Sequence, residues 1–413
     1  MRATLVAVVL SCHLSFACGC ISLHAEGQST NSTEVKVRIA YARRTHAKEL
    51  NLQNLQLTEV PAEVFTLPDL EKLSLSDNEI EELPRGIGKL TRLNFLEVGS
   101  NRLADMPAEI GALTNLKELW LFENRLKRLP TAILRLTNLE ALNVGFNGLE
   151  ELVGIGKLKS LKQLDLAGNQ LTRLPPEIGE LAHLERLDLL RNHIEQLPPE
   201  VGRLSNLQEL NLDENPLVAL PPQIGNLANL QGFMLSSSQL TRLPPELGRL
   251  AALKYLSVGA SRLSDVPPEI MNLGNLETLI ISPSQLSRLP SGIRQLKGLK
   301  GLFMAGGRLE SIPGEIAKLT QLEEVALEHN MLTSLPAEIC ELTNLKRLDL
   351  RDNNLQTLPP CLWTLSRLWT TDKGEPSRLG ISGNSLSSLP KVIVDHDDGP
   401  AALEYLRRKN QTP

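Results

Sequence analysis

Residues 184–206 read LERLDLLRNHIEQLPPEVGRLSN, and residues 207–229 read LQELNLDENPLVALPPQIGNLAN. Aligned without a gap, the two stretches share Leu at positions one, four, six, fourteen and twenty-one, Asn at position nine and Pro at position fifteen. Self-similarity at a fixed period is the signature of a repeat architecture. The unit LxxLxLxxNxLxxLPxxIxxLxx therefore decides the fold.

The same 23-residue unit continues in both directions, from residue 47 to about residue 394. We number its fifteen copies as repeats 1 to 15 in chain order. They begin at residues 47, 70, 93, 116, 139, 161, 184, 207, 230, 253, 276, 299, 322, 345 and 376. Repeat 5 is one residue short, because Val153 and Gly154 replace its proline corner, and an insertion at 368–375 precedes repeat 15.

The unit itself predicts its local structure. LxxLxL has the alternation of a short strand, with leucines inward and intervening residues outward. The Asn at position nine can bond backbone groups of the turn that leaves the strand. LPxxIxxL has near-helical spacing, and Pro fixes φ at its start. One copy cannot bury its leucines alone, so we expect an α/β solenoid with a parallel sheet and short convex helical segments.

Composition agrees with a repeated core and excludes several classes of protein. The chain has 413 residues, of which 85 are Leu, with 41% hydrophobic and 3% aromatic residues. Such a hydrophobic fraction excludes general disorder. The net charge is −5 and both signs are interspersed, which argues against nucleic acid as the main partner. No apolar run reaches the roughly eighteen residues of a membrane span.

Residues 1–25 have the pattern of a secretory signal peptide. Met1-Arg2 precedes the apolar run Ala3 to Leu10, and no charge follows before residue 21. Small residues before Cys18 and Cys20 resemble the lipobox of bacterial lipoproteins, so both are lipidation candidates. Cleavage after Ala25 would instead release a soluble protein. An uncleaved extension on a cytoplasmic protein is the third interpretation.

Cys12, Cys18 and Cys20 lie within residues 1–25, which leaves two cysteines, Cys340 and Cys361, for the rest of the chain. Two cysteines do not make a disulfide framework, and their spacing is not that of a zinc site. They fall in consecutive repeats, so a single bridge is open to them in an oxidising compartment.

Both ends of the solenoid need caps, because a terminal repeat exposes its core. We expect residues 26–46 to be a linker and an N-terminal cap. Residues 37–44 resemble the short helix that opens many Roco-type arrays, although the alternation of Val35, Val37, Ile39 and Tyr41 also suits a strand. We expect residues 395–413 to form a C-terminal capping helix, with acidic residues first and Arg407 near its end.

The repeat pattern resembles the leucine-rich repeat superfamily over residues 47 to about 394. Its LPxxIGxLxxL form is similar to Ras-group repeat proteins, including LAP scaffolds, and to the repeat arm of bacterial Roco proteins. The resemblance implies a right-handed curved horseshoe that binds partners on its concave sheet. The cysteine-rich flanking caps of secreted animal members are missing, which favours a bacterial or intracellular type of array.

No motif in the sequence carries catalytic chemistry. GxSxG, HExxH and Gly-rich phosphate loops do not occur, and His183, His193 and His329 sit at unrelated repeat positions. The acidic run Asp395 to Asp398 reads more simply as a charged helix start than as a metal site. We therefore expect no enzyme activity, no cofactor and no metal.

Outward positions three, five, seven and eight of each repeat would form the concave face. In repeats 3 to 5 they carry four aromatic side chains on adjacent strands, which is a concentration in a chain so poor in aromatics. Exposed aromatics are enriched at binding hot spots, whereas chance with mutual stacking is the alternative. The candidate partner-binding residues are Phe95, Trp120, Phe122 and Phe146, with Glu97, Glu118 and Glu123 as an acidic rim.

The face changes character in later repeats. Repeats 6 to 8 turn polar, with Asp165, Arg186, Asp188, Arg191, Asp213 and Glu214. Repeats 9 to 12 offer a second candidate surface made of Met234, Tyr255, Ile280 and Phe303. In those repeats the position-nine Asn is replaced by Ser238, Ser261, Ser284 and Gly307. Either these repeats have diverged under relaxed selection, or they form a second binding surface.

Together these patterns predict a non-enzymatic interaction module that acts as a monomer. We expect it to bind a protein or peptide and not nucleic acid, and to meet a membrane only through a lipid anchor. Exported, it would be a secreted, periplasmic or surface recognition protein. The alternative is a cytoplasmic signalling scaffold of the Ras-group type.

Overall fold

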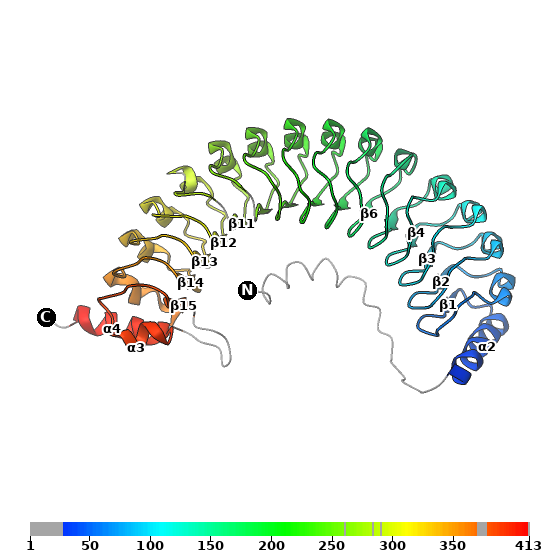
Figure 1. The fold of residues 1–413 in the computed structure, drawn as a ribbon, viewed down its shortest axis with the longest axis horizontal. Coiled ribbons are helices and arrows are strands. Elements are labelled where there is room, and N and C mark those ends of the chain that lie inside the picture. The colour runs from blue at the N-terminus through cyan, green and yellow to red at the C-terminus, as the bar shows by residue number, and fades with distance from the viewer. Residues whose placement is uncertain (1–27, 260–261, 283–284, 290, 370–377, 412–413) are drawn as a thin grey trace.

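The computed structural model describes residues 28–259, 262–282, 285–289, 291–369 and 378–411. The signal peptide expected at 1–25, its cysteines Cys18 and Cys20, and most of the 368–375 insertion lie outside these ranges. Figure 1 shows the repeats stacked along an open arc, with strands on the inner side and helical turns on the outer side. The expected horseshoe solenoid is confirmed.

Within the described ranges the inner side is one parallel sheet of fifteen strands in chain order. The strands are β1 (Glu49–Asn51), β2 (Lys72–Ser74), β3 (Phe95–Glu97), β4 (Glu118–Trp120), β5 (Ala141–Asn143), β6 (Gln163–Asp165), β7 (Arg186–Asp188), β8 (Glu209–Asn211), β9 (Gly232–Met234), β10 (Tyr255–Ser257), β11 (Thr278–Ile280), β12 (Gly301–Phe303), β13 (Glu324–Ala326), β14 (Arg347–Asp349) and β15 (Leu379–Gly380).

Each of the strands β1 to β14 buries its central residue and turns its outer two residues to the concave side. In β8, Leu210 is fully buried between the partly exposed Glu209 and Asn211. Strands pair in register with the next repeat, so that Leu187 lies opposite Leu210. Residues at the same repeat position therefore form a straight column across the sheet. The neighbours of a concave side chain are the residues at the same position of the repeats before and after it.

The convex segments are tight 3-10 turns. They are η2 (Ala62–Thr66), η3 (Arg85–Lys89), η4 (Ala108–Ala112), η5 (Thr131–Arg135), η6 (Ile155–Lys157), η7 (Pro176–Glu180), η8 (Pro199–Arg203), η9 (Pro222–Asn226), η10 (Pro245–Arg249), η11 (Pro268–Asn272), η12 (Ser291–Gln295), η13 (Gly314–Lys318), η14 (Ala337–Glu341), η15 (Pro360–Thr364) and η16 (Ser366–Leu368). In repeat 7 the Val201 N–H donates to the Pro198 carbonyl at 3.1 Å. Five residues between fixed corners leave no room for longer helices.

The position-nine Asn forms the expected ladder. The Asn192 side chain is buried, and its Oδ1 accepts from the Leu171 N–H at 3.1 Å. Its Nδ2 donates to the carbonyls of Leu166 at 3.0 Å and Leu189 at 3.1 Å. One side chain thus ties two repeats together and satisfies backbone groups that have no partner in the sheet.

Glycine at position nineteen lets consecutive convex turns approach closely. A Cβ on Gly179 would lie 2.6 Å from the Glu200 carbonyl oxygen of the next repeat, at its position seventeen. Real Cβ atoms do not come so close to backbone, so the IG dipeptide of the unit is a packing requirement rather than a turn requirement.

We expect Gly179→Ala to lower the free energy of unfolding by about 1–3 kcal/mol, because the added methyl forces two backbones apart. Gly274→Ala is the matched control, since no atom of the described residues lies within 4 Å of its Cβ position. That change should be neutral or slightly stabilising. Urea unfolding of both variants checks the prediction, and equal midpoints would contradict it.

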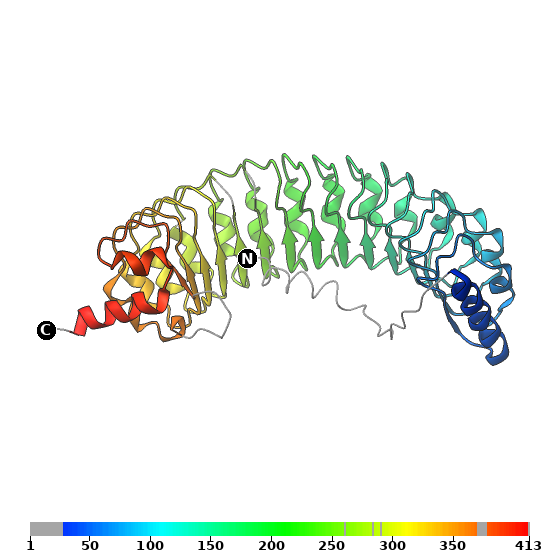
Figure 2. The same ribbon diagram turned by 60° about the horizontal axis from the view of Figure 1, so that its bottom comes forward.

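The N-terminal cap is the helix α2 (Gln28–Thr45), which decides between the helix and strand interpretations. Val35, Ile39 and Ala42 are buried against the first repeat, at helical spacing. The Arg38 guanidinium donates to the Asn51 carbonyl at 2.9 Å, at the open edge of the sheet. Figure 2 shows α2 lying across that end of the solenoid.

The C-terminal cap has two helices, α3 (Lys391–Asp395) and α4 (Gly399–Gln411), where the sequence predicted one from residue 395. Between them, Asp397 Oδ1 accepts the Ile381 N–H at 2.6 Å and the Ser382 N–H at 2.8 Å. Asp398 accepts the Ala401 N–H at 3.0 Å and caps α4. In the acidic run, Asp397 therefore accepts hydrogen bonds from the end of β15, and Asp398 caps the N-terminus of α4.

Cys340 and Cys361 form a disulfide, with Cα atoms 6.0 Å apart. Cys340 is at position nineteen of repeat 13, and Cys361 is at position seventeen of repeat 14. These are the two positions that approach in the glycine-containing repeats. The bridge therefore joins consecutive convex turns at a place where the repeat geometry already brings the chains together.

Candidate binding surface on the concave sheet

The strand β4 presents the centre of the candidate surface. Leu119 is fully buried, while Glu118 and Trp120 on either side of it are partly exposed. Successive residues of a strand point to opposite faces, so Glu118 and Trp120 face the concavity. The predicted orientation of these two side chains thus agrees with their partial exposure.

Phe95 and Trp120 pack together across two strands. Their ring centroids are 5.2 Å apart and their planes meet at 71°, an edge-to-face arrangement. The register places Phe95 opposite Glu118 and Glu97 opposite Trp120, so the two rings meet along a diagonal. Such contacts between aromatics stabilise their geometry and leave the other ring faces available.

Phe122 and Phe146 lean over glycines in the turns of neighbouring repeats. A Cβ on Gly99 would collide with the Phe122 ring, and one on Gly168 would lie 2.5 Å from Phe146 Cδ1. Phe122 is partly exposed, whereas Phe146 exposes 46% of its surface. The structure brings Phe95 and Trp120 into contact and places Phe122 and Phe146 in the turns that follow β4 and β5.

Phe146 also occupies a backbone conformation that suits a smaller residue. Wherever position eight lies within the described residues it is left-handed, with φ of 51° at Glu123, 52° at Phe146 and 63° at Gly168. Bulky residues rarely adopt this region, and the conformation costs about 1–2 kcal/mol. The chain therefore tolerates both backbone strain and an exposed aromatic ring at Phe146.

Of the three predicted rim carboxylates, Glu97 and Glu123 accept hydrogen bonds from neighbouring side chains. Burial raises the pKa of Glu97, while hydrogen bonds from Ser74 and Gln53 oppose the shift. Burial likewise raises the pKa of Glu118. Ser100 Oγ donates to Glu123 Oε2 at 2.8 Å. Because burial is the main influence on Glu97 and Glu118, a cation that approached them would meet poorly solvated carboxylates.

A second acidic group lies two strands further along. Asp165 and Asp188 face each other at position five of β6 and β7, and Asp213 lies at position seven of the next repeat. Burial raises the pKa of Asp188 to about 7, and the charge of Asp165 adds to the shift. Burial also raises the pKa of Asp213 to about 6.

The arginines beside these aspartates are paired elsewhere. Arg186 lies 3.3 Å from Glu209, and Arg191 makes two bonds to Glu214 at 2.7 and 3.2 Å. The charges that act on Asp188 are those of other carboxylates, and both raise its pKa. No cation is among the groups that shift the pKa of Asp188, so this part of the concave face is a negative region.

Where position five carries Asp or Asn, its side chain oxygen accepts a backbone hydrogen bond, and that bond does not need a charge. Asp188 Oδ1 accepts the Leu190 N–H at 2.9 Å. Asn143 and Asn211, in the same column, make the equivalent bond to Gly145 and Asp213 at 3.0 and 3.1 Å. An amide at position five therefore makes the same hydrogen bond as a carboxylate. The fold does not explain why residue 188 is Asp rather than Asn.

We expect Asp188→Asn to raise the melting temperature at pH 8 and to change it little at pH 4. The raised folded pKa means that the folded chain holds the proton more tightly than the unfolded chain, whose pKa is about 3.9. Wild-type stability should therefore fall as the pH rises from about 4 to about 7, and the amide removes that fall. Thermal melts at both pH values measure the effect.

Asp349→Asn is the matched control for this prediction, because Asp349 occupies the same column in β14. There burial is outweighed by Arg351, which bonds the carboxylate at 2.8 Å and lowers its pKa. The control should lower the melting temperature at pH 8. Equal shifts for the two variants would contradict a specific effect at Asp188.

The second candidate surface also has its residues on outward strand positions. Met234, Tyr255, Ile280 and Phe303 are partly exposed on the four strands β9 to β12. The ladder is interrupted beneath them, since the buried Ser238 hydroxyl has no hydrogen-bond partner among the described residues. Ser261 and Ser284 lie outside the described residues. Burial raises the pKa of Tyr255, with the charge of Asp213 acting in the same direction.

Two negative observations concern the described residues alone. Their His, Cys, Asp and Glu side chains do not gather in groups of three or more that could hold a metal ion. None of their helices has both the length and the apolar character to cross a membrane.

Sequence comparison identifies the repeats. The chain matches the family model described as leucine-rich repeat region over residues 40–154, 147–244 and 239–331. It matches the model described as leucine rich repeat over residues 320–370. No curated protein matches the sequence.

Solved structures of similar proteins come from bacteria and plants. The leucine-rich repeat protein LIC12759 of Leptospira interrogans is 33% identical with a TM-score of 0.79, over 87% of this chain and 97% of that one. The internalin InlF from Listeria monocytogenes, at 22% identity and a TM-score of 0.65 over 82% of this chain and 93% of that one, shares the fold. A plant peptide hormone receptor, RGFR1 in complex with RGF2, is 30% identical with a TM-score of 0.65, over 82% of this chain and 59% of that one.

Proposed function

This chain belongs to the leucine-rich repeat superfamily, whose fold is a protein-interaction fold, and we propose that it binds a protein or peptide partner on its concave sheet. One observation carries the proposal. Phe146 is 46% exposed in a strained left-handed conformation, on the face that also carries Phe95, Trp120 and Phe122. Neither the exposure nor the strain benefits the fold, and binding is the commonest reason for an exposed apolar cluster.

The proposed partner carries a basic segment beside an apolar anchor. Glu97, Glu118 and Glu123 flank the aromatics, and Asp188 adds a buried carboxyl where Asn would serve the fold. Complementary charge steers association and fixes orientation. The similar receptor RGFR1 was solved with the peptide hormone RGF2, which supports a peptide as one class of partner.

Met234, Tyr255, Ile280 and Phe303 are proposed as a second contact region for the same partner. They lie further along the same sheet, so a long ligand that follows the curve would reach both regions. The module is proposed to work as a monomer, without catalysis or a cofactor. A partner whose affinity ignores substitutions in both regions would contradict this arrangement.

We propose that the protein is exported, with residues 1–25 as its signal and Cys18 or Cys20 as a lipidation site. The disulfide between Cys340 and Cys361 supports an oxidising compartment. Mass spectrometry of the mature N-terminus tests this proposal. A start at Glu26 indicates a soluble secreted or periplasmic protein, and a lipid-modified start at Cys18 or Cys20 indicates a surface lipoprotein. Retention of Met1 would support the alternative of an intracellular scaffold.

Phe146→Asn is expected to weaken partner binding and to leave the chain equally or more stable. Asn adopts the left-handed region more readily than Phe, so the backbone strain falls while the exposed ring is removed. The probe is a peptide selected from a displayed random library on the immobilised wild-type chain. Its dissociation constant and the melting temperature are measured for both proteins. Unchanged affinity would remove Phe146 from the proposed surface.

A further inference from the structure

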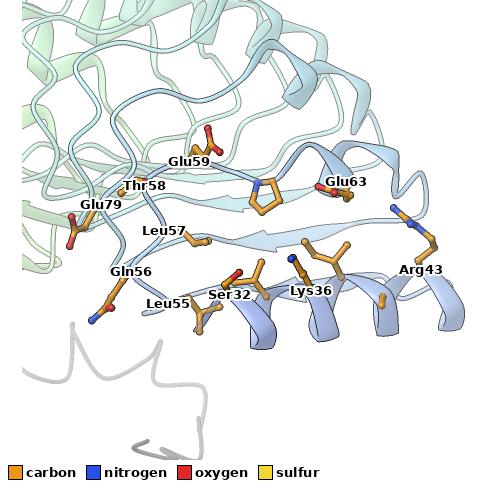
Figure 3. Close-up of a pocket in the computed structure, with 14 residues that line it drawn as sticks. Ser32, Lys36, Arg43, Leu55, Gln56, Leu57, Thr58, Glu59, Glu63 and Glu79 are labelled. Atoms are coloured by element: carbon orange, nitrogen blue, oxygen red, sulfur yellow. The ribbon is translucent and has the colours of Figure 1, made fainter. Parts of the chain in front are cut away.

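A cavity of about 550 Å³ lies between α2 and repeat 1, away from the aromatic cluster. Figure 3 shows α2 as one wall, and residues 55–63 as the other. Its inner surface includes Val35, Ile39 and Leu55, which are buried. Ligand clefts in proteins commonly have volumes of roughly 300–1,000 Å³, so this cavity, called the groove below, has the size of a binding site.

The two walls of the groove carry opposite charges. Lys36 and Arg43 extend from α2, while Glu59, Glu63 and Glu79 come from the first two repeats (Figure 3). The groove separates the two sets across its apolar inner surface. A ligand that fits must therefore present an anion to α2 and a cation to the repeats.

Only some of these charged groups already have partners. The Arg43 guanidinium donates to Thr66 Oγ1 at 2.9 Å, and Glu79 lies 3.2 Å from Arg102. Within the described part of the chain, the side chains of the other three groups make no hydrogen bond or ion pair. One ammonium on the helix wall and two carboxylates on the repeat wall thus remain open to a ligand.

We propose that this groove is a second binding site, which takes an extended peptide segment with an acidic and a basic residue side by side. Adjacent side chains of an extended chain point in opposite directions, so the acidic one would face Lys36 and the basic one Glu59 and Glu63. Of the apolar residues on either side, the one after the basic residue would lie against Val35 and Ile39 on α2, and the one before the acidic residue would lie against Leu55 on the repeat wall. The site is independent of the concave surface and of what binds there.

The test uses the peptide N-acetyl-Val-Glu-Lys-Val amide, because β-branched residues favour the extended form. Its NMR signals are followed during titration with the full chain. The wild type should bind it more tightly than the matched peptides Val-Lys-Lys-Val and Val-Glu-Glu-Val. Equal affinity for the three peptides, or no binding of the first, would overturn the proposal.

Charge reversal locates the site. Lys36→Glu should lower the affinity for Val-Glu-Lys-Val by about fivefold, which is the upper range for the loss of an exposed ion pair. The same change should raise the affinity for Val-Lys-Lys-Val. The double variant Glu59→Lys, Glu63→Lys should lower the affinity for Val-Glu-Lys-Val by the same factor and should raise the affinity for Val-Glu-Glu-Val. Lys89→Glu, on the convex turn η3, is the matched control and should change nothing.

Two further measurements separate the possible outcomes. Circular dichroism melts show whether each variant is folded, which is expected because Lys36, Glu59 and Glu63 are exposed. Trp120→Ala should leave binding of the tetrapeptide unchanged. If Trp120→Ala weakens it and the groove variants do not, the peptide binds on the concave sheet and the groove is not its site.

Discussion

Asn192→Ala is expected to lower the free energy of unfolding by about 1–3 kcal/mol. The side chain bonds the Leu171 N–H and the carbonyls of Leu166 and Leu189, and it is buried. Alanine leaves these backbone groups in a dry environment without partners. Water cannot replace the amide fully, because the neighbouring repeats close the space on both sides.

The loss should also be local. In a solenoid each repeat contacts its neighbours alone, so stability is close to a sum over neighbouring pairs. Hydrogen exchange should show lower protection in repeats 6 and 7, while repeats 1 and 2 keep theirs. Asn226→Ala, at an exposed Asn on a convex turn, is the matched control and should have little effect. A uniform loss of protection along the chain would contradict the one-dimensional picture.

Asn192 illustrates why so much of this fold could be predicted. Its partners are fixed by the repeat period, since every copy sees identical neighbours at identical offsets. The same reasoning gave the direction of Trp120, because β4 must turn Leu119 inward. A periodic sequence determines the inward and outward sides of each strand without knowledge of distant contacts.

The ends were harder to predict, because they lie outside the period. Val35 and Ile39 fit the alternation of a strand and the i, i+4 spacing of a helix equally well. The structure buries both together with Ala42, and it leaves Val37 57% and Tyr41 58% exposed. Those two exposed residues are what made the strand interpretation attractive, and burial against repeat 1 decided against it.

The disulfide and the acidic column needed three-dimensional information. Pairing of Cys340 with Cys361 depends on the approach of positions nineteen and seventeen, which no spacing rule reveals. The sequence placed Asp188 among polar residues, but its burial and the equivalent bond made by Asn211 emerge only from the structure. Likewise, the strain at Phe146 follows from the left-handed backbone of position eight.

Trp120→Ala is expected to weaken binding of the selected partner peptide by about 2 kcal/mol or more, roughly thirtyfold in dissociation constant. Trp120 lies at the centre of the aromatic set, in contact with Phe95 and between strands that carry Glu97 and Asn143. Tryptophan anchors contribute large apolar area at the centre of an interface, where water is excluded. Its removal also frees the Phe95 ring.

The fold should survive this change, because the inward-facing Leu119 and the Asn124 ladder bonds remain. Asn124 Nδ2 donates to the Val98 and Leu121 carbonyls at 2.9 and 3.1 Å, independently of the indole. Tyr41→Ala is the matched control, since it removes an aromatic ring that is 58% exposed on α2, outside the concave sheet. Calorimetric titration of the peptide and a thermal melt are measured for both variants. If the two alanine variants bind the peptide equally well, Trp120 is not an anchor, and the concave aromatics are surface packing among themselves.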